Sequence, residues 1–327
     1  MASPVPATPS NIARAAELIR SGGLVAFPTE TVYGLGANAL DSIAVASIFA
    51  AKGRPATNPV IVHVASSLST EELAVVDDHA RRIMDALWPG PVTLVLHRRD
   101  CIPSIVTAGG STVALRMPRH PVALALLEAA GVPIAAPSAN RSESLSPTRA
   151  EHVAASLGDA IAMILDSGPT DVGLESTVLD LTVAPPRILR PGMADIAAIE
   201  AALGERLARG GSNEEDGAAK SPGQMLRHYA PRTPLVLVSD LESTIALTEG
   251  TFAVLRLDDG TQFKSRKIRE SISLPLDPKA YAARLYDALH TLDAAGAECI
   301  VLQAPPRTPA WDAIWDRIFR AIQPKGR

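Results

Sequence analysis

The chain has 327 residues, of which 47% are hydrophobic and 20% charged, and its formal net charge is −4. This length fits about two ordinary domains, and the composition is typical of a globular protein. The net charge argues against a broadly basic nucleic-acid-binding surface, although a local basic groove is compatible with it. The two cysteines, Cys101 and Cys299, lie outside any Cys-x-x-Cys spacing. This excludes a disulfide framework and a cysteine-based zinc site, and it favours a reducing cytosol.

The N-terminal residues 1–11 lack the basic start and the apolar core of a secretory signal. No stretch approaches the roughly 18 apolar residues that a membrane-spanning helix needs. We therefore expect a cytoplasmic protein that does not contact a membrane.

Helices and strands are predicted to alternate along the first two thirds of the chain. The expected helices cover residues 11–20, 41–51, 71–87, 121–130, 149–157 and 195–203. The expected strands cover residues 24–27, 60–64, 92–96, 112–117, 132–136, 162–166, 176–181 and 187–190, and residues 28–36 are expected to form a loop. The alternation predicts an α/β fold. Because the strands are short and several adjoin directly, we expect a twisted mixed sheet flanked by helices.

The sequence changes character after this region. Residues 209–220 are rich in glycine and charge and have no apolar period, which predicts a linker. The alternation then resumes, with strands expected over 235–238, 252–255 and 299–302 and helices over 280–295 and 309–322. We therefore predict a first domain over 8–204, a linker or lid over 205–232, and a small Rossmann-like α/β domain over 233–327.

Several well-known nucleotide and hydrolase motifs are missing from the sequence. There is no Gly-x-x-x-x-Gly-Lys-Ser/Thr motif, and Gly34-Leu35-Gly36 lacks the third glycine of the dinucleotide fingerprint. Neither Gly-x-Ser-x-Gly nor His-Glu-x-x-His occurs. These observations disfavour a P-loop ATPase, a Rossmann dehydrogenase and an α/β-hydrolase.

Lys52 and Arg54 follow the helix expected over residues 41–51, with Gly53 between them. A helix C-terminus attracts cations, so a solvent-exposed helix cap is one interpretation of this pair. A phosphate clamp is the other, because arginine offers a forked donor and lysine a point charge. In both cases we expect the two side chains at an exposed helix end, so that alanine substitutions would leave the fold intact.

Other polar residues lie at the ends of predicted strands, where ligands of α/β sheets gather. Thr31 follows a strand, Arg116 ends one, and His63 lies within an apolar strand. His63 alone is more typical of a core residue, and Arg116 suits either a sheet edge or a carboxylate clamp. The same pattern recurs at Ser138, Asn140, Ser146, Ser176 and Arg190. The cluster is rich in cations and hydroxyls and poor in acids. It therefore predicts an anion site that works by positioning and charge neutralisation, as in phosphoryl or nucleotidyl transfer.

Several segments together carry a family resemblance. They read FPTETVYGLGANAL, KGRPATNPVIVHV, WPGPVTLVL, VALRMPRHP, PIAAPSANRSESLSPT, GLESTVLDL, ILRPG and SPGQMLRHYAP. With these motifs the chain closely resembles threonylcarbamoyl-AMP synthase in its two-domain form, which has a YrdC-like catalytic domain and a C-terminal extension domain. The motifs span about residues 10–231, and the remaining residues agree in size and α/β pattern. Within the linker, Gln224, Met225 and Leu226 depart from the basic and aromatic residues of many members.

The resemblance implies a nucleotidyltransferase that converts L-threonine, bicarbonate and ATP, with Mg²⁺, into threonylcarbamoyl-AMP and pyrophosphate for the threonylcarbamoyladenosine modification of tRNA. It implies catalytic roles for Lys52, Arg54, Ser138 and Asn140. The implied threonine-binding residues are Thr31, His63, Arg116, Ala136 and Ser176. The implied ATP-binding residues are Arg54, Asn58, Thr112, Ser138, Ser146, Arg190, His228 and Tyr229. No protein metal ligands are expected. Implied partners are a downstream tRNA threonylcarbamoyl transferase and, weakly, RNA.

Two rival interpretations come from different classes. A carbamoyl-transfer enzyme or a relative of dihydroxybutanone-phosphate synthase shares the expected architecture, but the latter should show an acid-rich, metal-binding phosphosugar site. An RNA-binding regulator would use a groove at Lys52 and Arg54. The net charge of −4 and an aromatic content of 4% weaken that alternative, because RNA binders usually need stacking rings and a basic face.

Overall fold

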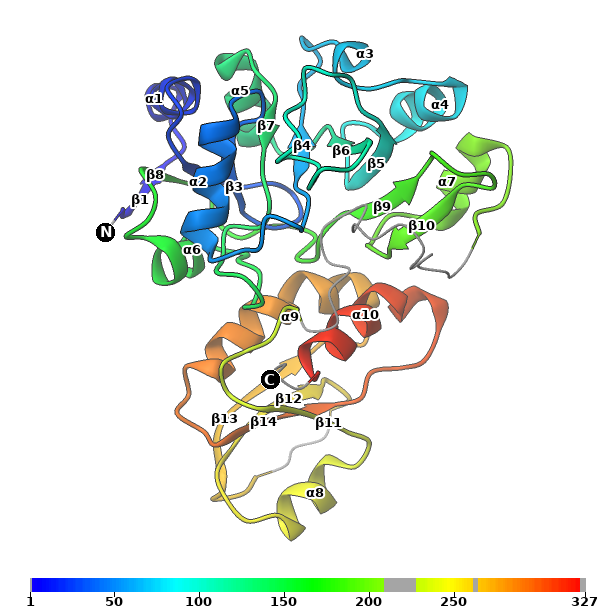
Figure 1. Ribbon diagram of the computed structural model, residues 1–327. Coiled ribbons are helices and arrows are strands. Elements are labelled where there is room, and N and C mark those ends of the chain that lie inside the picture. The colour runs from blue at the N-terminus through cyan, green and yellow to red at the C-terminus, as the bar shows by residue number, and fades with distance from the viewer. Residues whose placement is uncertain (1, 209–227, 261–263, 324–327) are drawn as a thin grey trace. The chain divides into compact units, whose positions relative to one another are not determined.

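The computed structural model describes residues 2–208, 228–260 and 264–323, and the chain divides into two compact units (Figure 1). The first unit comprises residues 1–142, 147–171 and 175–224, and the second comprises 143–146, 172–174 and 225–327. The linker expected over 209–220, and residues 224–226, lie outside the described residues. Among the described helices, none is long and apolar enough to cross a membrane. Cys101 and Cys299 are free thiols.

The first unit is built on a ten-stranded mixed sheet with the order β1-β8-β2-β3-β7-β4-β6-β5-β9-β10. The strands are β1 (Pro4–Pro6), β2 (Val25–Phe27), β3 (Gly34–Asn38), β4 (Ile61–His63), β5 (Val92–His97), β6 (Thr112–Arg116), β7 (Ile134–Ala135), β8 (Met163–Asp166), β9 (Thr177–Asp180) and β10 (Arg187–Arg190). Strand β4 runs parallel to β6 and β5 parallel to β9, whereas β7 is antiparallel to both β3 and β4. The predicted α/β fold with a mixed sheet is confirmed.

Helices pack on both faces of this sheet (Figure 1). They are α1 (Pro9–Arg20), α2 (Ser42–Lys52), α3 (Thr70–Leu73), α4 (Asp78–Leu87), α5 (Pro121–Ala130), α6 (Ala150–Leu157) and α7 (Ile196–Leu203). The apolar faces of α1 and α5 form one core with β2, β7 and β8. Those of α2, α4, α6 and α7 form the larger core on the opposite face. Burial of these two apolar layers is the main driving force for folding.

One half of the sheet face that packs against α1 and α5 has an apolar cluster without a helix. Beyond β7 its apolar residues form a small cluster drawn from strands alone, namely Ile61, Val95, Ala114 and Val178. Side chains two residues apart on a strand share a face. The same half therefore also carries the polar side chains of His63, Thr93, Arg116 and Ser176. No described helix contributes to this cluster, so this part of the sheet positions polar groups instead of burying a helix.

Two expected elements differ from the structure. The loop expected over 28–36 contains the start of β3, whose glycines hide the alternating pattern of a strand. A Cβ atom at Gly36 would lie 2.8 Å from both Phe27 and Ile134, so glycine is required by packing. The helix expected over 71–87 is broken into α3 and α4, because Asp77 caps a new helix by accepting a hydrogen bond from the backbone N–H of Ala80.

The second unit contains a four-stranded parallel sheet with the order β11-β14-β12-β13. Its strands are β11 (Leu235–Val238), β12 (Phe252–Leu257), β13 (Ile268–Leu274) and β14 (Cys299–Gln303). Its helices are α8 (Leu241–Leu247), α9 (Pro278–Asp293) and α10 (Asp312–Ala321), the last preceded by the 3₁₀ turn η2 (Pro309–Trp311). The predicted small α/β domain is confirmed. Strand β13 was missed because it is an edge strand with mostly exposed or half-buried residues, which weakens its pattern.

Candidate active site

The connection between β2 and β3 forms a tight, buried turn built on Thr29. The Thr29 hydroxyl accepts hydrogen bonds from the backbone N–H groups of Thr31 and Val32, each at 3.2 Å. It also lies 2.8 Å from the hydroxyl of Thr31. Both threonines are buried. Such a side-chain-to-backbone turn fixes where the Thr31 hydroxyl points.

Arg116, the last residue of β6, is held on three sides. Its Nη2 atom lies 2.8 Å from Glu30 Oε1, Nη1 donates to the Thr31 hydroxyl at 2.9 Å, and Nε donates to the carbonyl of Gly90 at 3.3 Å. Arg116 and Glu30 are 3% and 1% exposed. Burial alone would raise the pKa of Glu30, but the charge and hydrogen bond of Arg116 lower it overall, so this carboxylate is ionised at neutral pH. The expectation of a cluster poor in acids is therefore wrong at this position.

His63 lies beside Arg116 in the register of β4 and β6. Its ring packs edge-on against Phe27 with the centroids 6.1 Å apart. Burial, and then the nearby charge of Arg116, lower the pKa of His63 to about 3, so the ring is neutral at physiological pH. Its Nδ1 atom has no hydrogen-bond partner among the described residues. A buried neutral imidazole suits contact with a ligand as well as packing in a core.

Ser176 immediately precedes β9 and sits in a polar network. Its hydroxyl lies 2.7 Å from the hydroxyl of Thr93 and accepts from Arg190 Nη2 at 3.1 Å, while Arg190 Nε donates to its carbonyl at 3.1 Å. A Cβ atom at Gly192 would lie 2.4 Å from the backbone nitrogen of Thr177. The segment after β10 therefore packs directly on the backbone around Ser176, and the side chains of Thr93 and Arg190 hold its hydroxyl in place.

Lys52 ends α2, but its side chain is buried. Its Nζ atom donates to the carbonyl of Ser138 at 2.5 Å and to the carbonyl of Asn140, and it lies 3.5 Å from the Asn140 side-chain oxygen. Burial and the charge of Arg54 lower the pKa of Lys52 well below its usual value. The expected exposed helix end is wrong, because the chain after β7 passes over it and the Ser142 N–H bonds the Lys52 carbonyl at 2.8 Å.

Arg54 is likewise buried, which contradicts the expected exposed position. Its Nε donates to the carbonyl of Asn58 at 3.3 Å, and Nη2 donates to that of Pro59 at 2.9 Å, just before β4. Thr112 begins β6, at the opposite end of that strand from Arg116. Ala136 is buried, and its backbone N–H donates to the carbonyl of Ile61 in β4. The first unit thus brings together two clusters, Lys52–Ser138–Asn140 and Glu30–Thr31–His63–Arg116.

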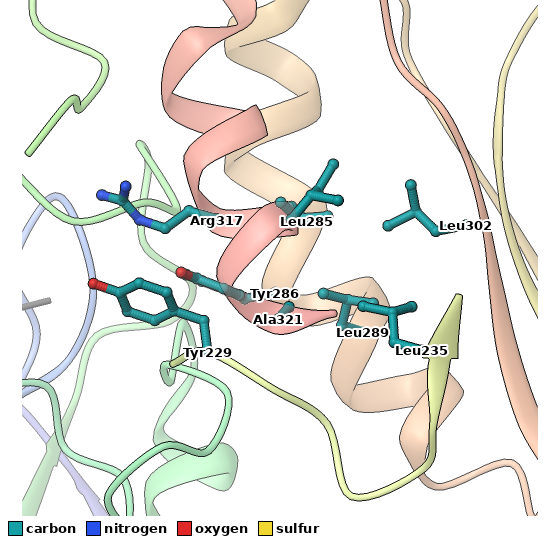
Figure 2. A pocket seen from close by; sticks show the side chains of 9 residues that line it. Tyr229, Leu235, Leu285, Tyr286, Leu289, Leu302, Arg317 and Ala321 are labelled. Atoms are coloured by element: carbon teal, nitrogen blue, oxygen red, sulfur yellow. The ribbon is translucent and has the colours of Figure 1, made fainter. Parts of the chain in front are cut away.

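Tyr229 and His228 belong to the second unit. Tyr229 lies there beside Tyr286 and Arg317, as Figure 2 shows. Its ring centroid lies 5.9 Å from that of Tyr286 and 5.1 Å from the Arg317 guanidinium carbon, and the His228 ring packs edge-on against it. Its backbone is left-handed, with φ of 61°, an unusual conformation for an aromatic residue.

Ser146 also falls in the second unit, where its carbonyl lies 3.1 Å from the Nε2 atom of His290. The roles expected for Ser146, His228 and Tyr229 toward ATP stay predictions. Sequence reasoning gave no role to Glu30 or Thr93. A signal for Thr93 was available, because it is the one hydroxyl in the apolar run Val92–Leu96 of β5. Glu30 lay within a quoted motif, but nothing in the sequence paired it with Arg116.

Within the described part of the chain, no three His, Cys, Asp or Glu side chains form a group that could hold a metal ion. The described chemistry instead consists of buried cations, hydroxyls and one ion pair on a sheet that carries helices on both faces. Groups of this kind bind anionic and zwitterionic ligands. Fold and site together define an α/β protein whose larger sheet carries a buried cluster of cations and hydroxyls.

Comparisons with known proteins narrow this class. The profile of a family described as "Telomere recombination" matches residues 17–192, and that of "Threonylcarbamoyl-AMP synthase, C-terminal domain" matches residues 194–322. The chain therefore belongs to the threonylcarbamoyl-AMP synthase family. The threonylcarbamoyl-AMP synthase of Bacillus subtilis is 42% identical over 95% of this chain and 92% of its own length.

Two solved structures of Pyrococcus abyssi Sua5 share the fold. One, a variant, has a TM-score of 0.90 and 37% identity and covers 98% of this chain and 96% of its own. The other, complexed with L-threonine, has a TM-score of 0.88 and 39% identity and covers 96% of this chain and 95% of its own. The resemblance inferred from the sequence motifs is thereby confirmed.

Proposed function

We propose that this chain is an L-threonylcarbamoyladenylate synthase, a nucleotidyltransferase that condenses L-threonine, bicarbonate and ATP into threonylcarbamoyl-AMP and pyrophosphate. The observation that carries the proposal is family membership over both regions of the chain. Relatives of about 40% identity over more than nine tenths of the chain bear this enzyme's name. The L-threonine complex of P. abyssi Sua5, which has the same fold, supports the amino-acid substrate.

On the amino-acid side, Arg116 binds the threonine carboxylate in this proposal. The hydroxyls of Thr31 and Ser176 are each fixed by neighbouring groups, so they are suited to orient the substrate's hydroxyl and amine. His63 and Ala136 line the same binding site. His63 acts there as a neutral imidazole, because its pKa is about 3.

On the nucleotide side, Lys52, Arg54, Ser138 and Asn140 hold the phosphates and the carbamate. The hydrogen bonds between Lys52 and the segment of Ser138 and Asn140 support this grouping. Mg²⁺ would be bound to the phosphates of ATP, as part of the substrate, and would neutralise part of their charge. Further ATP contacts remain predictions, namely Asn58, Thr112, Ser146, Arg190, His228 and Tyr229.

The reaction proceeds in two bond-forming steps. Bicarbonate loses hydroxide to give CO₂, the neutral amine of threonine adds to its carbon, and the proton that the amine loses joins the hydroxide, so that the carbamate and water are formed. A carbamate oxygen then attacks the α-phosphorus of ATP, and the bond from that phosphorus to pyrophosphate breaks. Buried cations and fixed donors stabilise the charge that develops on the phosphoryl oxygens. The described side chains therefore act by positioning and charge neutralisation.

Pyrophosphate release by the full chain tests the proposal. We expect release only when ATP, L-threonine and bicarbonate are all present, with threonylcarbamoyl-AMP detected by mass spectrometry. ATP turnover that is independent of threonine would contradict the assignment. Turnover that requires RNA but not threonine would instead favour the rival RNA-binding function.

The wider setting of the enzyme is also proposed. Its product is a reactive mixed anhydride that must pass to a transferase acting on tRNA, so that transferase is the expected partner, with weak contact to RNA. A cytoplasmic location agrees with the two free cysteines.

A further inference from the structure

The Glu30–Arg116 pair balances its own charge. Glu30 comes from the connection between β2 and β3, and Arg116 comes from the end of β6. Their side chains meet at 2.8 Å, and both are almost fully buried. The neighbouring His63 is neutral. The group therefore contains one positive and one negative charge, both removed from water.

The pair also fixes the guanidinium. Arg116 donates hydrogen bonds to Thr31 and to Gly90, and its Nη2 atom forms an ion pair with Glu30. Arginine has five N–H groups, so N–H groups are left to donate to a ligand. A guanidinium held along its whole planar edge loses little freedom when a carboxylate binds. Glu30 and Thr31 thus pre-organise Arg116.

A site that carries both charges discriminates between ligands. A lone buried arginine would favour any carboxylate. The added carboxylate of Glu30 repels a simple carboxylic acid and attracts an ammonium group. The ligand best matched to this ion pair is a zwitterion, with its carboxylate toward Arg116 and its ammonium toward Glu30.

We propose that Glu30 is a specificity-determining residue that recognises the α-ammonium group of the amino-acid substrate and rejects carboxylic acids that lack it. The proposal rests on the proposed function for the identity of the amino acid, but not for its zwitterionic class. It concerns binding alone, and no proton transfer is assigned to Glu30. A purely structural ion pair would not distinguish a zwitterion from its des-amino analogue.

Isothermal titration calorimetry on the full chain tests this proposal with L-threonine and with 3-hydroxybutyrate, the same acid without its amino group. We expect the wild type to prefer threonine by about 100-fold, as for a hydrogen-bonded charged group. Glu30→Gln should reduce this preference by about 10-fold or more. Glu128→Gln is the matched control, because Glu128 is an exposed glutamate that accepts a hydrogen bond from Ser66, and it should leave the preference unchanged.

If the wild-type protein binds 3-hydroxybutyrate as tightly as threonine, the inference is overturned. This measurement needs no variant, so it tests the inference even if Glu30→Gln does not fold. An unchanged preference in folded Glu30→Gln would overturn it as well. Glu30→Asp, which keeps the charge, should retain the preference. If the wild type does not bind threonine but binds another amino acid more tightly than that acid's own des-amino analogue, the threonine assignment fails and the role of Glu30 stands.

Discussion

The Lys52 cluster and the Arg116 cluster solve the burial of a cation in different ways. Lys52 donates to the backbone carbonyls of Ser138 and Asn140, whereas Arg116 faces the carboxylate of Glu30. Carbonyl groups solvate a cation but leave its net charge in place, while a carboxylate cancels it. The first arrangement suits a polyanion such as a nucleoside triphosphate, and the second suits a zwitterion. The difference in charge compensation therefore parallels the two proposed substrates.

The same contrast shows in the titration of the two clusters. Burial and the nearby Arg54 lower the pKa of Lys52, so the free protein holds this proton weakly. The Arg116 charge lowers the pKa of Glu30 against the opposing effect of burial, so the ion pair is stable at neutral pH. Binding of an anion near Lys52 should raise its pKa again. The Lys52 cluster thus contains no counter-charge of its own, whereas the Arg116 cluster contains one in Glu30.

Removing Arg116 should break the self-compensated cluster most severely. Arg116→Met leaves Glu30 buried without a counter-charge, and we expect a loss of about 3–5 kcal/mol in the free energy of unfolding together with loss of threonine binding. Urea denaturation measures the first effect and calorimetry the second. The double variant Arg116→Met/Glu30→Gln should recover much of the stability but not the binding. A stable single variant would show that the pair is not coupled.

Removing Lys52 should act mainly on turnover. Lys52→Ala is expected to lower the rate of pyrophosphate release by about 10²–10³-fold, because a fixed cation for the phosphates is lost. Since the side chain is buried and hydrogen-bonded, the free energy of unfolding should also fall by about 1–3 kcal/mol. The exposed Lys279→Ala serves as the control. Wild-type activity in Lys52→Ala would return this residue to a structural role.

Acid should destabilise the protein through His63. Its pKa is about 3 in the folded protein and about 6.5 when unfolded, so its contribution is complete above pH 6.5 and is lost as the pH falls toward 3. At about 1.4 kcal/mol per pH unit, the free energy of unfolding at pH 4.5 is lower by roughly 2–3 kcal/mol. Urea denaturation from pH 7 to 4.5 should show a shallower decline for His63→Gln. Equal slopes would contradict the low pKa.

A smaller effect is expected at Thr93, whose hydroxyl contacts that of Ser176, a residue of the proposed threonine-binding site. Thr93→Val removes one hydroxyl partner of Ser176, worth about 1 kcal/mol, and should raise the KM for threonine about 5-fold with little change in kcat. Thr93→Ser keeps the hydroxyl and should behave like the wild type. Steady-state kinetics separate the two parameters. A fall in kcat with unchanged KM would place Thr93 outside threonine binding.

Sequence patterns predicted most helices and strands because these elements bury regular apolar faces, and the boundaries of α5 and β11 agree with the structure to the residue. They failed where packing overrides the pattern, as at Gly36 in β3. Burial was harder to predict. Lys52 and Arg54 follow an ordinary helix end, and nothing local indicates that the distant segment around Ser142 covers it.

The acid in the site was missed for a similar reason. Glu30 and Arg116 are far apart in sequence, and only the order of the strands brings them together. Residue type at strand ends indicated an anion site, but the pairing of charges within it depends on tertiary structure. The sequence could therefore suggest candidate side chains for the site, and not which of them neutralise one another.

The close packing of Gly192 has a genetic consequence. A methyl group there would collide with the backbone beside Ser176, which is not a flexible side chain that can move away. Gly192→Ala should therefore yield a protein that assembles at low temperature and fails on modest heating. Such an allele would be conditional, and growth at two temperatures would reveal whether the enzyme is essential to the cell that carries it.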